Sequence, residues 1–146
     1  MLTLLFALAL ASADPALDVN MLEARTHPDT HWYGERAYLF RAAGITEHGL
    51  EGHTITWVIE VKRKLADWKT AKSWLVVKQK IAPHTPVPDV SFGLIYRSMA
   101  KAKMQPGEHV ARFTATDETG RALFVREVPF NLPAAGPNAY DPRDFK

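Results

Sequence analysis

Four of the six histidines lie in two short segments and have the chemistry of metal ligands. Neutral imidazoles are common ligands of zinc and copper, so loops that bring several of them together could hold such an ion. Pro28, Gly49 and Gly52 predict loops rather than helices around these residues. Two interpretations stay open, a metal site or solvated loop histidines. The candidate ligands are His27, His31, His48 and His53.

No segment of the chain has the pattern of a catalytic site. Ser73, Ser91 and Ser98 are the candidate nucleophiles, and none stands in a Gly-x-Ser-x-Gly turn. The segment 49–52 lacks the lysine of a phosphate-binding loop, and paired carboxylates for glycoside hydrolysis are unmarked. The chain has no cysteine, which excludes thiol nucleophiles, thiolate metal sites and disulfides. The sequence therefore predicts a protein that is not an enzyme and uses no cofactor.

A basic segment, residues 62–80, is the clearest candidate for a binding surface, because Asp67 is its only acidic residue. Trp68 and Trp74 lie among its cations, and aromatic rings beside cations can stack on sugars or bases. An anionic polymer such as envelope polysaccharide, or an acidic protein, would fit this segment. The alternative is a solvated sheet face with tryptophan packed under lysine stems. The candidate binding residues are Lys62, Arg63, Lys64, Trp68, Lys69, Lys72 and Trp74.

The elements that position these residues are predicted to be short antiparallel strands. Apolar and polar residues alternate most clearly over residues 54–62, where Ile55, Trp57, Ile59 and Val61 share one face. We therefore expect Trp57 at the centre of the core. The same reasoning predicts further strands at residues 16–24, which would form an edge, and at 36–43, 74–81, 90–96, 109–116 and 121–132.

The segments between these strands are predicted from their breakers. In the strand at 36–43, Tyr38, Phe40 and Ala42 should face the core, because the opposite register would bury Arg41. The other expectations are a flexible turn region over Gly44 to Gly52, a loop or single helical turn at 64–73, and a polar crossover without regular structure at 98–105.

The stretch from Pro106 to Leu132 carries a family resemblance. Its motifs are Pro106-Gly107-Glu108-His109, then Phe113, Asp117 and Gly120, then Val128-Pro129-Phe130-Asn131-Leu132. They resemble the final hairpin of bacterial immunoglobulin-like sandwich modules of exported proteins, with His109 where that pattern usually has tyrosine. The resemblance implies an all-β, immunoglobulin-like, two-sheet antiparallel sandwich of about seven strands. It also implies a use in adhesion, scaffolding or subunit contact, and it transfers no catalytic residue.

The first 13 residues predict a secretory signal peptide. They carry no charge, and the apolar run Leu2 to Leu10 precedes Ala11-Ser12-Ala13, a small-x-small cleavage pattern. The run is too short to span a membrane, and the alternative is a buried N-terminal element. We expect cleavage after Ala13, a periplasmic or secreted protein without a transmembrane segment, one domain at 14–132 and a flexible tail at 133–146.

These observations favour a non-catalytic exported domain that serves as a protein-interaction or scaffolding module in a bacterial cell-envelope assembly. Two alternatives remain. The first is a module that binds glycans or anionic polymers through the basic segment, and the second is a metal-binding domain that uses the loop histidines. A formal net charge of +2 is too close to balance to predict a nucleic-acid partner.

Overall fold

The computed structural model of the protein describes residues 14–25, 31–32 and 35–132. The predicted signal peptide, the segment that contains His27 and the predicted tail lie outside the described residues.

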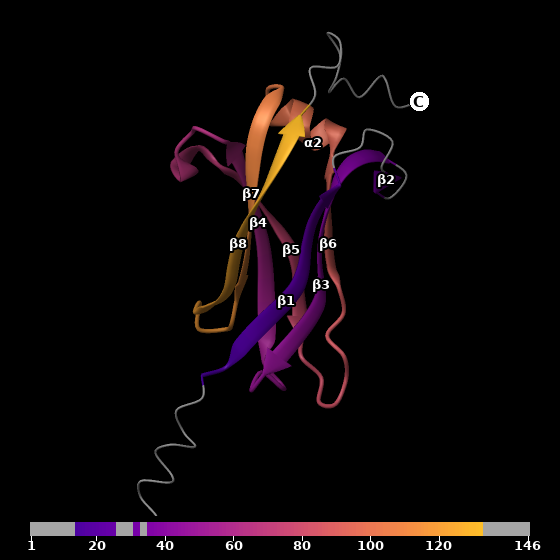
Figure 1. Cartoon of the computed structure of the whole chain (residues 1–146), viewed down its shortest axis with the longest axis vertical. Helices are drawn as coiled ribbons and strands as arrows, with labels where there is room; N and C mark the ends of the chain where they lie inside the picture. The colour runs from indigo at the N-terminus through magenta and orange to yellow at the C-terminus, as the bar shows by residue number, and fades with distance from the viewer. Residues whose placement is uncertain (1–13, 26–30, 33–34, 133–146) are drawn as a thin grey trace, which may run out of the picture.

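Two antiparallel sheets pack face to face (Figure 1). In the first sheet β3 (Glu35–His48) pairs with β1 (Ala16–Arg25) on one side and β6 (Val90–Ile95) on the other, and the two-residue β2 (His31–Trp32) pairs with the start of β3. The second sheet has the order β5-β4-β7-β8. Its strands are β4 (Thr54–Arg63), β5 (Lys72–Lys80), β7 (Gly107–Thr116) and β8 (Ala122–Leu132). The predicted all-β sandwich of seven antiparallel strands is confirmed.

The connection between β4 and β5 keeps both strands in the second sheet. In constant-type immunoglobulin sandwiches the fourth strand joins the first sheet, whereas here β5 pairs with β4 along its length. The connection contains the single 3₁₀ turn η1 (Trp68–Thr70), which Asp67 caps by accepting a hydrogen bond from the Lys69 amide at 2.8 Å. The predicted loop or helical turn is confirmed, and the strand begins two residues before the predicted Trp74.

The core lies between the sheets and is built from the predicted faces. Tyr38, Phe40 and Ala42 are fully buried, as is Trp57, which confirms both registers. The indole Nε1 of Trp57 donates a hydrogen bond to Gln79 Oε1 at 2.7 Å, so the one polar atom of this side chain is satisfied. β1 pairs with β3 alone, so its predicted place at an edge is also confirmed.

The prediction of a flexible turn region beginning at Gly44 is wrong for residues 44–48, because β3 continues to His48. Gly44 lies opposite Asn20 of β1, with φ of 61°, and an added Cβ would lie 2.6 Å from the Asn20 Cβ. Glycine is therefore needed inside this strand pair and does not mark its end. The turn itself occupies residues 49–53.

The prediction of an irregular crossover at 98–105 is also wrong, because α2 (Tyr96–Lys101) occupies part of it. Met99 is fully buried and anchors this one-and-a-half-turn helix on the core. A helix of six residues is too short to show a helical period in the sequence, which explains the failure of the prediction. Within the described part of the chain, no helix has the length and apolar character needed to cross a membrane.

Candidate functional site

The predicted histidine cluster is not assembled among the residues that the structure describes. His48 Nε2 lies 3.1 Å from Asp18 Oδ2 on β1, and His53 Nδ1 lies 3.0 Å from Glu118 Oε2 in the β7–β8 turn. His27 and the side chain of His31 lie outside the described residues. In the described ranges no group of three or more His, Cys, Asp and Glu side chains is placed to hold a metal ion.

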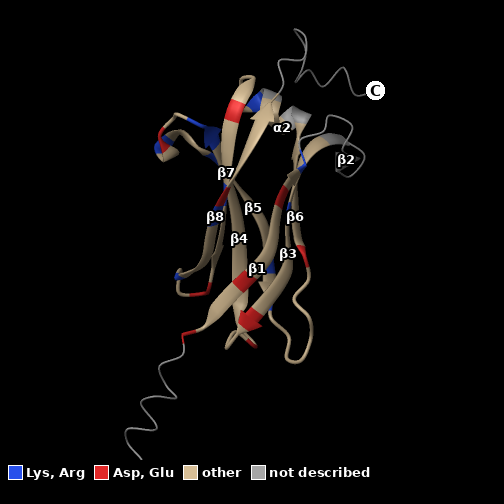
Figure 2. Cartoon of the chain, viewed as in Figure 1, with Lys and Arg blue, Asp and Glu red and all other residues tan. Residues whose placement is uncertain are grey.

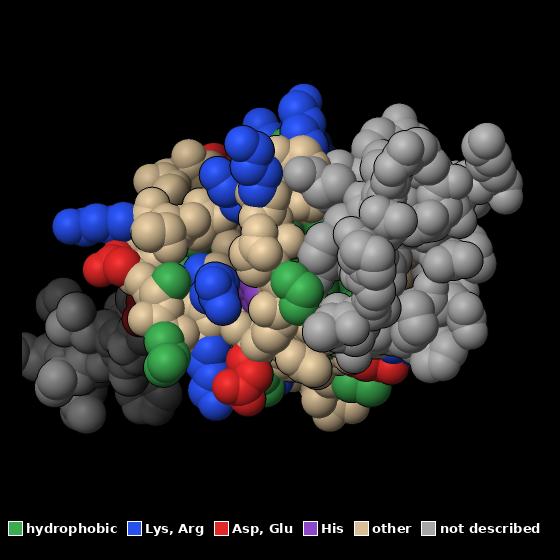
Figure 3. Space-filling view, turned by 90° about the horizontal axis from the view of Figure 1, so that it is seen from above, with side chains coloured by type: hydrophobic (Ala, Val, Ile, Leu, Met, Phe, Trp, Pro, Cys, Tyr) green, Lys and Arg blue, Asp and Glu red, His purple; other side chains and the backbone are tan. Residues whose placement is uncertain are grey.

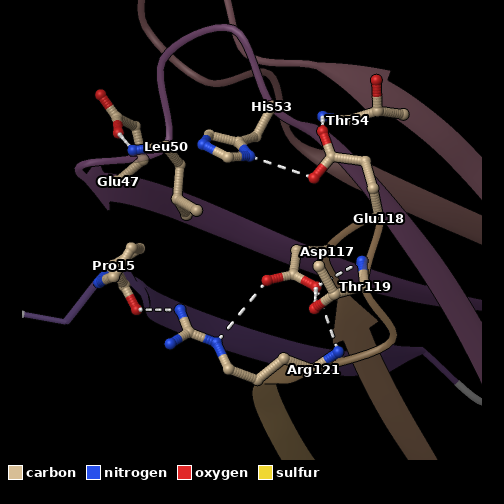
Figure 4. Close-up of polar contacts among 9 residues, drawn as sticks. All are labelled: Pro15, Glu47, Leu50, His53, Thr54, Asp117, Glu118, Thr119 and Arg121. Atoms are coloured by element: carbon tan, nitrogen blue, oxygen red, sulfur yellow. Dashed lines mark hydrogen bonds and ion pairs between the residues drawn. The ribbon is translucent and has the colours of Figure 1, made fainter.

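His53 instead belongs to a group of polar contacts at the end of the sandwich where the β7–β8 turn lies (Figure 4). Glu118 accepts hydrogen bonds from the Thr54 amide at 2.6 Å and from His53. The amide of Thr54, and after it the His53 ring, lower the pKa of Glu118 from 4.5 to about 2. Below it, Arg121 donates to the carbonyl of Pro15 at 3.1 Å. These contacts tie the β7–β8 turn to β4 and to the start of β1, which is a structural role.

The two predicted tryptophans lie on opposite faces of the second sheet. Trp74 pairs with the buried Ile59, points into the sandwich and packs against Phe92 of β6 with ring centroids 5.8 Å apart. Trp68 lies over the outer face, where the guanidinium of Arg112 is 3.9 Å from its ring centroid. The two rings therefore do not form one stacking platform.

Trp68 packs over cations that are already engaged. The ammonium of Lys62 lies 4.8 Å from the ring centroid and donates to the carbonyls of Arg63 and Lys64. Arg112 holds both carboxylate oxygens of Glu60, at 3.0 and 3.1 Å. This arrangement corresponds to the alternative raised above, tryptophan packed on the stems and heads of basic side chains.

The basic residues that remain are divided between two places. Lys62, Arg63 and Lys72 line a pocket of about 200 Å³ at one end of the sandwich. Lys64 lies outside this pocket and approaches Glu108 at 3.6 Å, and Lys69 is exposed in η1. Figure 2 shows Lys and Arg gathered at this end. Of the predicted binding residues, the structure therefore brings three to one cavity.

Two of the other lining residues are basic side chains that the sequence did not single out for binding, Lys103 after α2 and His109 at the start of β7. His109 is 2% exposed, and its Nδ1 donates to the Gly107 carbonyl at 2.9 Å. Burial lowers its pKa; the Gly107 carbonyl opposes this and Arg63 adds to it. The sequence did offer one signal for this residue, because His109 stands where the resembled pattern usually has tyrosine.

The outer edge of β5 is a second candidate surface. β5 pairs with β4 alone, and its other edge has no backbone hydrogen-bond partner within the described part of the chain. Six of its nine residues are exposed, among them Leu75 at 58% and Val77 at 38%. Lys78 and Lys80 follow directly, and β5 contains no acidic residue. An exposed strand edge of this kind is a template for an added strand.

Comparisons with known proteins add little to this geometry. The chain matches no family model, and no curated protein matches it. Among solved structures, the chain is similar to β-glucosidase 3B from Thermotoga neapolitana in complex with α-D-glucose, with a TM-score of 0.45 and 13% sequence identity. The similarity covers 80% of this chain and 17% of that chain. The fold and the two candidate surfaces therefore rest on the structure described above.

Proposed function

We propose that the protein is a non-catalytic, exported binding module of a bacterial cell-envelope assembly, and that it docks an acidic, extended segment of a partner protein on the free edge of β5. The observation that carries this proposal is the unpaired edge of β5, with exposed apolar side chains next to lysines. The resemblance of residues 106–132 to immunoglobulin-like modules of exported proteins, and the signal-like sequence of residues 1–13, support the compartment and the style of use.

The backbone of β5 supplies the hydrogen bonds for such a contact. A segment that adds as a strand satisfies its own backbone groups on the edge, and alternate side chains give specificity. Leu75 pairs with Val58, whose row continues across the sheet through Thr114 to Val125 on the outer face. A partner strand would thus extend a row of β-branched and apolar side chains that already crosses four strands.

The charge of β5 selects the chemistry of the partner. Lys78 and Lys80 have no ion-pair partner within the described residues, and both are exposed. Opposite charges across neighbouring strands stabilise a sheet and like charges destabilise it. Two copies of β5 would oppose lysine-rich edges, whereas a segment with Glu or Asp between apolar residues would complement them. The edge is therefore suited to an acidic partner rather than to a second copy.

Nuclear magnetic resonance with a defined probe tests this proposal. The probe is a short blocked peptide of alternating valine and glutamate, and its control carries lysine in place of glutamate. We expect the acidic peptide to slow amide exchange along β5 and the basic peptide to leave it unchanged. Equal effects of the two peptides, protection elsewhere than β5, or no protection with either would overturn the proposal.

A matched pair of variants separates the edge of β5 from the outer face of the sheet. Leu75 and Val125 lie in the same row, are 58% and 55% exposed, and occupy opposite edge strands. Because both sites are exposed, neither substitution should unfold the domain. We expect Leu75→Glu to abolish peptide binding and Val125→Glu to leave the peptide affinity within about twofold. Loss of binding in both variants would assign the partner to the open face. Self-association that only Leu75→Glu removes would assign the edge to a second copy, and either result refutes the proposal as stated.

A further inference from the structure

The pocket at the end of the sandwich gathers cations that lack a counter-ion. Arg63, Lys72 and Lys103 come from β4, β5 and the segment after α2, and each lines the pocket. None of the three makes an ion pair with a carboxylate of the described residues. No acidic residue lines the pocket, because the neighbouring Glu108 faces Lys64 outside it. Figure 3 looks onto this end and shows Lys and Arg side chains around a small area of histidine surface.

The backbone at Lys103 is a second, independent observation. The amide of Met104 donates to the Met99 carbonyl at 3.0 Å, which closes the end of α2 with Ala102 as the C-cap and Lys103 as the residue after the cap. Lys103 has φ of 53°, the left-handed conformation that glycine usually supplies at this position. A lysine in a glycine position is locally unfavourable, and here its side chain contributes to the lining of the pocket.

His109 gives the pocket a polar group of defined chemistry. Because a carbonyl can only accept, the hydrogen bond to Gly107 requires the proton on Nδ1, which leaves Nε2 with a free lone pair in the neutral ring. Nε2 is thus the ring nitrogen left for a ligand in the pocket that His109 lines. The other charged residues that line the pocket are Lys62, Arg63, Lys72 and Lys103, all of them positive.

We propose that this pocket binds a phosphate group, as the free ion or on a small phosphate monoester, between Arg63, Lys72 and Lys103, with His109 Nε2 accepting a hydrogen bond from a protonated phosphate oxygen. The volume of about 200 Å³ accommodates such a group with a small substituent, and Ala66, Ala102 and Met104 supply apolar walls. Charge-assisted hydrogen bonds from Arg and Lys to phosphate oxygens hold the anion. This phosphate site is separate from the β5 edge, and the proposal does not depend on what binds to that edge.

The neutral histidine also sets the selectivity. At neutral pH inorganic phosphate carries a proton that it can donate to Nε2 in a hydrogen bond, whereas sulfate carries none and would place an oxygen lone pair against the lone pair of Nε2. A phosphate monoester, whose second pKa is about 6, donates such a proton only as its monoanion. Burial and Arg63 both act to keep His109 neutral, because they lower its pKa. We therefore expect phosphate to bind about tenfold more tightly than sulfate at neutral pH, and the difference to shrink as His109 becomes protonated.

Calorimetric titration of the whole chain with inorganic phosphate, phenyl phosphate and sulfate tests the proposal. Lys72→Gln should weaken phosphate binding about tenfold, and Lys69→Gln, in the same basic segment but outside the pocket, should leave it unchanged. Lys103→Gly is the sharper variant, because it should weaken phosphate binding about tenfold while the midpoint of thermal unfolding stays the same or rises.

The outcomes decide between a built site and general basicity. No saturable binding at millimolar phosphate, or equal weakening by Lys69→Gln and Lys72→Gln, would overturn the site. Equal affinity for phosphate and sulfate at neutral pH would overturn the role of His109. Because Leu75→Glu should leave phosphate binding unchanged and Lys103→Gly should leave peptide binding unchanged, failure of one proposal is distinguishable from failure of the other.

Discussion

Replacement of Trp57 by alanine measures how much of the stability depends on the centre of the sandwich. The side chain is fully buried, its ring lies 5.7 Å from that of Phe124, and its Nε1 donates to Gln79. Truncation removes the ring contacts, leaves a cavity and deprives the Gln79 oxygen of its donor. Large-to-small replacement of a buried tryptophan costs about 3 to 5 kcal/mol of the free energy of unfolding, and we expect this range for Trp57→Ala.

Trp68→Ala is the matched control, because it removes the same side chain from the outer face of the same sheet. Trp68 is half-buried and contacts Lys62 and Arg112 through its ring. Such contacts contribute about 0.5 to 1 kcal/mol each at exposed sites, so we expect a loss of about 1 to 2 kcal/mol. Urea unfolding followed by far-ultraviolet circular dichroism gives both values without relying on tryptophan fluorescence. A cost below about 1 kcal/mol for Trp57→Ala, or equal costs for the two variants, would refute this account of the core.

Two further predictions concern the ends of the domain. The pKa of Glu118 in the folded protein is lowered to about 2, so its contribution to stability should be present above pH 4.5 and be lost as the pH falls toward 2. We therefore expect Glu118→Gln to lower the midpoint of thermal unfolding at neutral pH and to weaken the dependence of that midpoint on pH between 4.5 and 2. Calorimetry across a pH series measures both effects. Expression of the whole chain in a bacterium, with N-terminal sequencing of the periplasmic protein, should give Asp14 as the first residue, and an intact Met1 in the cytoplasmic fraction would contradict export.

The strands were predictable because their signal is local. Over β4 and β7, alternate residues are buried, and that alternation is written directly in the sequence as apolar and polar types. Trp57 could be placed at the centre of the core for this reason. The turn at Gly120, with φ of 85°, was equally accessible, because Asp117 and Gly120 are the residues that such a loop requires.

The binding surfaces were less accessible because they depend on how distant segments meet. Trp68 and Trp74 are six residues apart, yet the connection that carries Trp68 folds over the outer face while Trp74 enters β5 pointing inward. Gly44 is of a residue type typical of turns, yet it lies within β3. The reason is its close approach to Asn20 of β1, a contact between segments that are distant in sequence. Lys103 lies in a segment without periodicity, and only the end of α2 brings it to the same cavity as Lys72.

His109 uses one of its two ring nitrogens within its own strand. Nδ1 donates to the carbonyl of Gly107, two residues before it, so the neutral ring has only Nε2 left for a ligand. Arg63, Lys72 and Lys103 also line the pocket, and within the described residues none of the three pairs with a carboxylate. This combination of unpaired cations with one neutral imidazole is the chemistry on which the proposed phosphate site depends.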